Sequence, residues 1–317
     1  MNDRFDKKDK YQSKNNRSGG SKNGGKYPPK DRAPRAYEPK PYRAPAQPRE
    51  EEMRDFSRPS GQEEIGNGAV IGRNAVRELL QSERTVDKLL VRRGDREGSI
   101  VVLIAQAKEK GIPVIEVDRT KLDEMAGTVP HQGIIALAAE KDYVEPEDIL
   151  RIAEKRGEPP LIAIADGITD PYNLGALIRC AEGLGAHGLI IPKRRAVGLT
   201  PLVTKASAGA IEHLAVAKVT NLAQTVKMLQ DKGVWVYAAE AGGSDYDKTN
   251  FRGPCALIFG SEGDGVSALL KERCDGIVSI PMKGKVNSFN VSTAAAILLA
   301  EAARQHRVAA MEQGAQE

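Results

Sequence analysis

The chain has no leucine, isoleucine or valine before Ile65, although these residues are frequent in the rest of its 317 residues. A segment without them cannot bury enough apolar surface to offset the conformational entropy that is lost on ordering. We therefore predict that residues 1–64 form a disordered tail. Since 40% of all residues are hydrophobic, the cores must be built from the remaining residues, which suffice for two compact domains.

Cysteine and histidine are scarce, with three and four copies. Cys180, Cys255 and Cys274 are isolated and form no CxxC pair, which argues against a disulfide framework or a structural zinc site. We expect no bound metal. The sequence also lacks a run of about 18 apolar residues and the apolar segment of a secretory signal. These absences favour a cytoplasmic protein without a membrane-spanning segment.

Positive charge is concentrated at the N-terminus. Residues 1–49 contain 14 Lys and Arg against five Asp and Glu, a net of +9, whereas the whole chain carries +4. The rest of the chain is therefore about −5, so the charge alone does not show that the folded part binds nucleic acid. Four tyrosines lie among the basic residues, a composition suited to loose contact with RNA phosphates and bases. A solubilising tail is the alternative interpretation.

Short apolar runs alternate with helical periodicity from residue 66 onward, which is typical of α/β structure. Residues 66–142 predict a small α/β domain. Its expected strands lie at 69–71, 88–91, 113–117 and 134–138, and its expected helices near 74–81 and 99–110. Residues 143–159 are rich in acids and proline, and we interpret them as a linker with a short helix at 148–155.

Residues 160–310 contain a longer series of alternating strands and helices, which predicts a mostly parallel sheet covered on both faces. The expected strands lie at 161–165, 188–191, 214–219, 234–239, 256–259 and 277–280. The expected helices lie at 173–184, 201–208, 222–231, 266–273 and 291–306.

A first polar segment, residues 166–179, follows the strand at 161–165 and opens a helix. At about 100° per residue, the apolar side chains of this helix share one face and Arg179 lies away from it. Arg179 therefore points to solvent or a cleft, where it could hold a phosphate or a carboxylate. The alternatives are a solvated helix arginine for Arg179 and a simple N-cap for Asn173.

Two further polar segments follow late strands. Residues 260–265, with the sequence GSEGDG, form a glycine-rich loop directly after an apolar strand, and exposed backbone N–H groups in such a loop can hold an anion or a polar cofactor edge. A tight turn is the alternative. Residues 280–293 place Asn287, Ser288, Asn290 and Ser292 before an apolar helix. One of them would suffice as a cap, so their accumulation predicts a polar wall around a ligand.

In their order along the chain and in their amino-acid sequences, these three segments resemble the signature motifs of the SpoU methyltransferases, a branch of the SPOUT class of RNA methyltransferases. The resemblance covers residue 161 to about residue 305. Residues 71–80, IGRNAVRELL, and 131–133, HQG, look like the substrate-binding domain of the ribosomal-RNA members, which is similar to ribosomal protein L30e. Within the family, the resemblance is closest to the members that methylate a guanosine in the peptidyl-transferase region of 23S rRNA.

The resemblance implies transfer of a methyl group from S-adenosylmethionine to a ribose 2′-hydroxyl of RNA, with 23S rRNA rather than DNA as partner. The implied catalytic residues are Arg179, Asn173, Glu262 and Asn290. The implied donor-binding residues are Gly260, Gly263, Ile280, Met282, Ser288 and Phe289. The implied RNA-binding residues are Arg73, Asn74, His131 and Gln132. A C-terminal trefoil knot and a homodimer across the active site are also implied. Phe289 departs from the leucine that is more usual at its position.

Three alternatives remain at this point. A Rossmann-type methyltransferase or nucleotide-binding enzyme would place its glycine loop after the first strand, whereas residues 260–265 follow a late strand. A tRNA 2′-O-methyltransferase would share all three motifs. A non-catalytic RNA-binding or ribosome-assembly factor could keep the fold, although Asn173, Arg179, Glu262 and Asn290 are all present.

Overall fold

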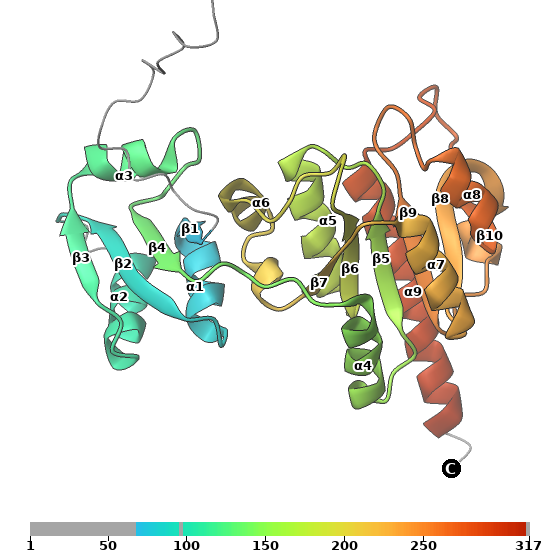
Figure 1. The fold of residues 1–317 in the computed structure, drawn as a ribbon, viewed down its shortest axis with the longest axis horizontal. Coiled ribbons are helices and arrows are strands. Elements are labelled where there is room, and N and C mark those ends of the chain that lie inside the picture. Colours follow the sequence, from blue (N-terminus) through green and yellow to red (C-terminus); the bar gives the residue numbers. More distant parts are fainter. Residues whose placement is uncertain (1–67, 95–97, 315–317) are drawn as a thin grey trace, which may run out of the picture. The chain divides into compact units, whose positions relative to one another are not determined.

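A computed structural model describes residues 68–94 and 98–314. The predicted disordered tail, residues 1–64, lies outside these residues. The described part contains two β-sheets, each with its own helices (Figure 1). The α/β class expected from the sequence is thus confirmed.

The first sheet has four strands in the order β1-β4-β2-β3. Its elements are β1 (Ala69–Ile71), α1 (Arg73–Gln81), β2 (Val86–Arg92), α2 (Ser99–Glu109), β3 (Val114–Val117), α3 (Arg119–Ala126) and β4 (Ile134–Ala138). β4 is antiparallel to β1 and β2, whereas β2 and β3 are parallel. The apolar sides of α1 and α2 pack on one face of this sheet and that of α3 on the other. The sequence did not predict α3, whose eight residues bury only three side chains.

Residues 143–159, predicted as a linker, contain α4 (Pro146–Arg156). The side chains of Glu145 and Asp148 form a capping box at its start, and Gly157 ends it in the left-handed conformation that glycine favours. Ile149 is fully buried and joins the core of the second sheet. The short helix is therefore confirmed, and it covers part of a sheet face.

The second sheet has six strands in the order β10-β8-β9-β5-β6-β7, and every neighbouring pair is parallel, as predicted. The strands are β5 (Leu161–Ala165), β6 (Gly188–Pro192), β7 (Ala215–Val219), β8 (Trp235–Asp245), β9 (Cys255–Phe259) and β10 (Gly276–Ser279). The α-helices are α5 (Pro171–Gly183), α6 (Pro201–Ala206), α7 (Leu222–Asp231), α8 (Ala268–Arg273) and α9 (Val291–Gly314), and two 3₁₀ turns cover Ala210–Glu212 and Tyr246–Lys248.

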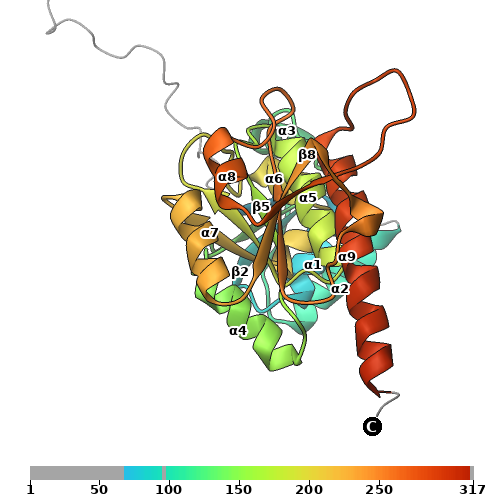
Figure 2. The same ribbon diagram turned by 90° about the vertical axis from the view of Figure 1, so that its right-hand side faces the viewer.

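Both faces of this sheet are covered, so the central strands β5 and β9 are completely buried. α5, α6 and α9 contribute to the core on one face, and α4, α7 and α8 contribute to the core on the other (Figures 1 and 2). β8 is longer than predicted, and its pairing with β10 shifts register between Ile277 and Val278. α9 continues eight residues beyond the predicted end at residue 306. The trefoil knot stays a prediction.

Among residues 68–94 and 98–314, no helix is long and apolar enough to cross a bilayer. In the same residues, no three His, Cys, Asp or Glu side chains gather in a way that could hold a metal ion.

Candidate functional site

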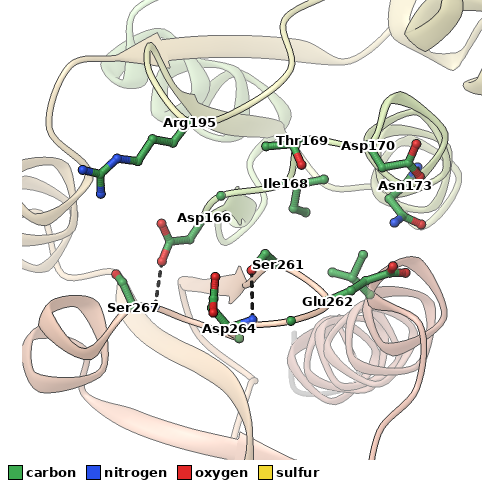
Figure 3. Close-up of a pocket in the computed structure, with 14 residues that line it drawn as sticks. Asp166, Ile168, Thr169, Asp170, Asn173, Arg195, Ser261, Glu262, Asp264 and Ser267 are labelled. Carbon is green, nitrogen blue, oxygen red and sulfur yellow. Dashed lines mark hydrogen bonds between the residues drawn. The ribbon is translucent and has the colours of Figure 1, made fainter. Parts of the chain in front are cut away.

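The first two polar segments leave the same edge of the second sheet. β5 and β9 are parallel neighbours that end together, since Ala165 pairs with Phe259 and the N–H of Asp166 donates to the carbonyl of Phe259. The carboxyl ends of parallel strands are the usual place for a ligand site. Here the loops after β5 and β9, residues 166–170 and 260–267, line a cavity of about 490 Å³, which we call the acidic cleft (Figure 3).

Asn290 connects all three polar segments. Its side-chain Nδ2 donates to Asn173 Oδ1 at 2.8 Å and to Glu262 Oε1 at 2.6 Å. Its Oδ1 accepts from the backbone N–H groups of Ser292 and Thr293, at the start of α9. One amide therefore caps a helix with its oxygen and joins two distant motifs with its nitrogen. Three of the four predicted catalytic residues lie in direct contact.

Asn173 is not the N-cap of α5. That place belongs to Asp170, whose carboxylate accepts from the backbone N–H groups of Tyr172 and Asn173. Pro171 occupies the first helical position, where its missing N–H costs nothing. Because Asp170 provides the cap, the buried side chain of Asn173 is available to accept a hydrogen bond from Asn290. The simple capping interpretation of Asn173 is therefore wrong.

Two carboxylates hold the exit of the glycine loop. Asp166 Oδ2, after β5, accepts from the N–H of Ser267 at 2.8 Å. Glu240 Oε2, near the middle of the long strand β8, accepts from the N–H of Val266 at 3.2 Å. Because β9 lies between β8 and β5, the loop after the middle strand is fixed by acids from both neighbours. We call this pair the carboxylate clamp.

The glycine loop itself is closed by a bridge between Ser261 and Gly265. Gly260 must be glycine, because a Cβ there would overlap the backbone of Gly265. Gly265 has φ +66° and a Cβ on it would meet the Glu240 carboxylate. Gly263 has open space around it, so packing does not require a glycine at this position.

A second cavity, of about 470 Å³, lies on the other side of the glycine loop, and we call it the mixed pocket. Residues 261–265 line both cavities. The mixed pocket contains apolar side chains beside backbone and polar groups, as ligand sites usually do. All six residues predicted to bind the donor line it: Gly260, Gly263, Ile280, Met282, Ser288 and Phe289.

The predicted RNA-binding residues of the first sheet gather only in part. Arg73, His131 and Gln132 line a cavity of about 450 Å³, which we call the arginine cavity because Arg92 and Arg119 also line it. Gln132 has φ +55°, a strained conformation for its residue type. Its side-chain and backbone oxygens both accept from Arg73, at 3.0 Å.

His131 is held by two neighbours. Its Nδ1 accepts from the N–H of Gly133 at 3.0 Å and its Nε2 lies 2.9 Å from Asp123. Since Nδ1 must accept, the neutral ring carries its proton on Nε2. Asn74 does not join the arginine cavity: it accepts from Arg77 and lines a different cavity.

Models of known protein families match both parts of the chain. The family model "SpoU rRNA Methylase family" matches residues 160–300, and the model "RNA 2'-O ribose methyltransferase substrate binding" matches residues 69–144. A Bacillus subtilis protein named YacO, described as a TrmH family tRNA/rRNA methyltransferase, is 46% identical over 237 residues, 74% of this chain and 95% of the relative. The chain belongs to the SpoU methylase family. It is accordingly an RNA methyltransferase by family.

Other members of the SpoU family agree with this placement. A TrmH family relative from Staphylococcus haemolyticus is 42% identical over 241 residues, 75% of this chain and 96% of the relative. The SpoU methyltransferase AviRb of Streptomyces viridochromogenes, solved with AdoMet, has a TM-score of 0.64 and 25% identity, covering 76% of this chain and 90% of AviRb. A solved RNA 2′-O ribose methyltransferase has a TM-score of 0.63 and 26% identity, covering 75% and 88%.

Arg179, expected in the first SpoU motif, does not lie with the other three predicted catalytic residues. It is exposed, which confirms its place off the apolar face of α5. It lines a separate cavity of about 560 Å³ together with Asn74, Glu182 and His213. Asn173 and Arg179 are thus six positions apart on α5, and their side chains line different cavities of the same chain.

Two thiols of the second sheet, Cys180 and Cys255, are not activated as nucleophiles by their surroundings. Burial raises the pKa of Cys180, although neighbouring Arg179 acts against this effect. Burial also raises the pKa of Cys255 to about 12. Both are therefore neutral thiols at physiological pH, and the thiolate is the reactive form.

Sequence reasoning missed three residues of the site: Asp166, Glu240 and Arg195. Asp166 could have been found, because a polar residue directly after a buried strand of a parallel sheet lies at the ligand edge. Glu240 and Arg195 gave no such signal, since only the assembled sheet brings Glu240 of β8 to the mixed pocket and Arg195, after β6, to the acidic cleft.

Proposed function

We propose that this chain transfers a methyl group from S-adenosylmethionine to the ribose 2′-hydroxyl of a guanosine in 23S rRNA, in the cytoplasm. The observation that carries the proposal is the contact of Asn290 with Asn173 and Glu262. It joins three motifs that are far apart in the sequence. Asn173 and Glu262 line the acidic cleft, and Glu262 also lines the mixed pocket, in the glycine loop that forms the wall shared by the two cavities. A donor in one cavity and an acceptor in the other would meet at this wall.

The methyl donor of the family is S-adenosylmethionine, which supplies an electrophilic methyl group on a positively charged sulfur. The mixed pocket fits such a ligand in chemistry. Its walls combine apolar side chains, among them Phe259, Ile280 and Leu298, with the backbone of the glycine loop. The carboxylates of Glu240, Glu262 and Asp264 also line it, which suits a positively charged ligand.

The side chains of Asn173, Glu262 and Asn290, next to the shared wall, suit the positioning of a ribose. Asn173, Glu262 and Asn290 offer amide and carboxylate groups that can hydrogen-bond to hydroxyls. Their mutual hydrogen bonds fix their orientation before any ligand binds. Fixing two reactants in this way removes much of the entropic cost of their encounter.

Arg179 supports a homodimer as the active form. In one copy it is exposed and faces a different cavity from Asn173 and Glu262. We propose that the Arg179 of one copy completes the site of the other. A guanidinium is a poor proton acceptor, so the role of Arg179 is to stabilise negative charge that develops on the attacking oxygen, while solvent or phosphate takes the proton.

Mixing two inactive variants tests this arrangement. Arg179→Ala and Asn290→Ala are each expected to lose activity. In a mixed dimer, one site would combine the intact Asn290 of the first copy with the intact Arg179 of the second. We expect partial recovery of methyl transfer on mixing. If Arg179 acts within its own chain, every site in the mixture carries a defect and no activity returns.

Mapping the RNA 2′-O-methyl groups of cells with and without the protein tests the substrate. We expect one guanosine of 23S rRNA to lose its methyl group. Loss of a tRNA methyl group instead would support the tRNA alternative. No lost methyl group, together with no transfer of labelled methyl groups in vitro, would support the non-catalytic assembly factor.

A further inference from the structure

The acidic cleft has a charge problem if it receives RNA. Four carboxylates line it, those of Asp166, Asp170, Glu262 and Asp264. Among the described lining residues, one side chain carries positive charge, and this is Arg195 (Figure 3). A ribose that reaches Asn173 brings a phosphate with it. Carboxylates and phosphate repel each other in a partly desolvated cleft, so a cation is needed where the phosphate lies.

Arg195 is available for this role. It follows β6 in the exposed sequence Lys193-Arg194-Arg195. Within residues 68–94 and 98–314, its guanidinium makes no salt bridge or hydrogen bond with another side chain or with the backbone. Its φ of +60° is unusual for a residue other than glycine. Such strain persists where the surroundings impose it, and it is concentrated at functional sites.

The surroundings of Arg195 do impose its position. Before it, the N–H of Lys193 donates to the carbonyl of Val219 at 2.7 Å. After it, the N–H of Val197 donates to the carbonyl of Ile168 at 3.0 Å. Ile168 belongs to the loop between β5 and α5 that leads to Asn173. The position of Arg195 is thereby linked to the first motif through the backbone.

We infer that Arg195 binds a phosphate of the substrate RNA beside the target ribose and so positions that ribose at Asn173 and Glu262. The inference rests on the proposed function. A guanidinium suits the task because its planar fork can donate two hydrogen bonds to one phosphate. The four carboxylates on the rest of the wall disfavour any other course of the backbone through the cleft.

Arg195→Ala tests the inference, with Arg194→Ala as the matched control. Arg194 is the adjacent exposed arginine and does not line the acidic cleft. In a methyl-transfer assay, Arg195→Ala should raise the KM for RNA about tenfold, as expected for one lost charged contact, and leave the Kd for S-adenosylmethionine unchanged. The slope of log RNA affinity against log salt concentration should become smaller by about one, as expected when one phosphate contact is lost. Arg194→Ala should change the KM for RNA and the Kd for S-adenosylmethionine less than twofold.

Arg195→Gly separates binding from structure. Glycine adopts φ +60° without strain, so this variant should keep or raise the Tm while it loses RNA affinity as the alanine variant does. Arg195→Lys should recover part of the affinity, because it keeps the charge without the fork. Equal losses for Arg194→Ala and Arg195→Ala, or unchanged RNA affinity in Arg195→Gly, would overturn the inference. Absence of methyl transfer by the wild-type protein would instead reject the proposed function, since RNA binding is measured separately.

Discussion

Two cavities of similar size, about 450 Å³ and 490 Å³, carry opposite charge in the two parts of the molecule. The arginine cavity of the first sheet is lined by Arg73, Arg92 and Arg119 with one acid, Asp123. The acidic cleft of the second sheet is lined by four acids with one arginine. Size alone therefore does not distinguish these sites. Their charges act differently on RNA, since the arginine cavity attracts a phosphate backbone and the acidic cleft repels it except at Arg195.

The two parts also hold their loops differently. In the arginine cavity, Gln132 stays in a strained conformation while its oxygens accept from Arg73. In the acidic cleft, glycines provide the unusual backbone and the carboxylate clamp holds the loop by its N–H groups. Substitutions in one part should therefore affect one ligand and leave the other unchanged. The four predictions below use this separation, from the largest expected effect to the smallest.

Replacement of Asn290 by alanine should have the largest effect. It removes the amide that joins Asn173 to Glu262, and we expect turnover to fall by about 10²–10³, comparable to loss of one preorganised catalytic donor. Single-turnover methyl transfer at saturating RNA and donor measures this loss. Asn221→Ala is the control, because Asn221 caps α7 in the same way and makes no contact with Asn173 or Glu262. Both variants should lose about 1 kcal/mol of stability, and equal activity in both would contradict the prediction.

Replacement of Glu240 by glutamine should weaken donor binding. Glutamine keeps an acceptor for the N–H of Val266 but loses the charge and the salt bridge to Lys271. We expect the Kd for S-adenosylmethionine to rise roughly tenfold, with little change in RNA affinity. Calorimetry with the full chain measures both. Glu272→Gln, a neutralised acid on α8 outside both cavities, should leave the donor Kd unchanged. An unchanged Kd in Glu240→Gln would show that the charge of Glu240 does not contribute to donor binding.

Replacement of Arg73 by alanine should show the reverse pattern. Arg73 lines the arginine cavity and donates to both oxygens of Gln132. RNA affinity should fall about tenfold, and the slope of log RNA affinity against log salt concentration should become smaller by about one. Donor affinity should stay the same. Arg151→Ala, on α4 and paired with Asp148, serves as a control for the loss of one surface arginine. A changed donor affinity in Arg73→Ala would break the separation between the two parts.

The smallest effect concerns acid stability, which should be a property of the second sheet. Burial lowers the pKa of His187 below its ordinary value of 6.5, against the opposing effect of Glu158. Its Nδ1 accepts from the N–H of Leu161 at 3.0 Å, a bond that protonation breaks. The folded state therefore keeps this histidine neutral, while the unfolded state binds a proton below about pH 6.5. Stability from this group is present above that pH and is lost as the pH falls further.

Thermal unfolding between pH 7 and pH 5 measures this effect. The Tm should fall by a few degrees on acidification, and His187→Gln should show a flatter profile from a lower starting value. The flattening is partial, because burial also lowers the pKa of His306. An identical pH profile in the variant would show that His187 does not contribute.

The sequence predicted the parts of this protein that depend on local pattern. The spacing of apolar residues gave the parallel sheet of residues 161–280 and the exposure of Arg179, both of which the structure confirms. The amino-acid sequences of three polar segments indicated the family, which the comparisons confirm. The sequence did not predict helix α3 or the full length of strand β8. The apolar spacing of both elements is weak, and contacts with neighbouring elements stabilise them.

Only the tertiary structure decided which polar residues meet. Asn290 and Asn173 lie 117 residues apart in sequence, and their hydrogen bond depends on the order of β5, β9 and β10 in the sheet. The same order brings Glu240 to the glycine loop, while backbone contacts around β6 and β7 set Arg195 at the cleft. Asn173 and Arg179 line different cavities because their six-position spacing places them on different sides of α5. Periodicity records which side of an element is buried, whereas a contact between distant elements depends on how the whole sheet is assembled.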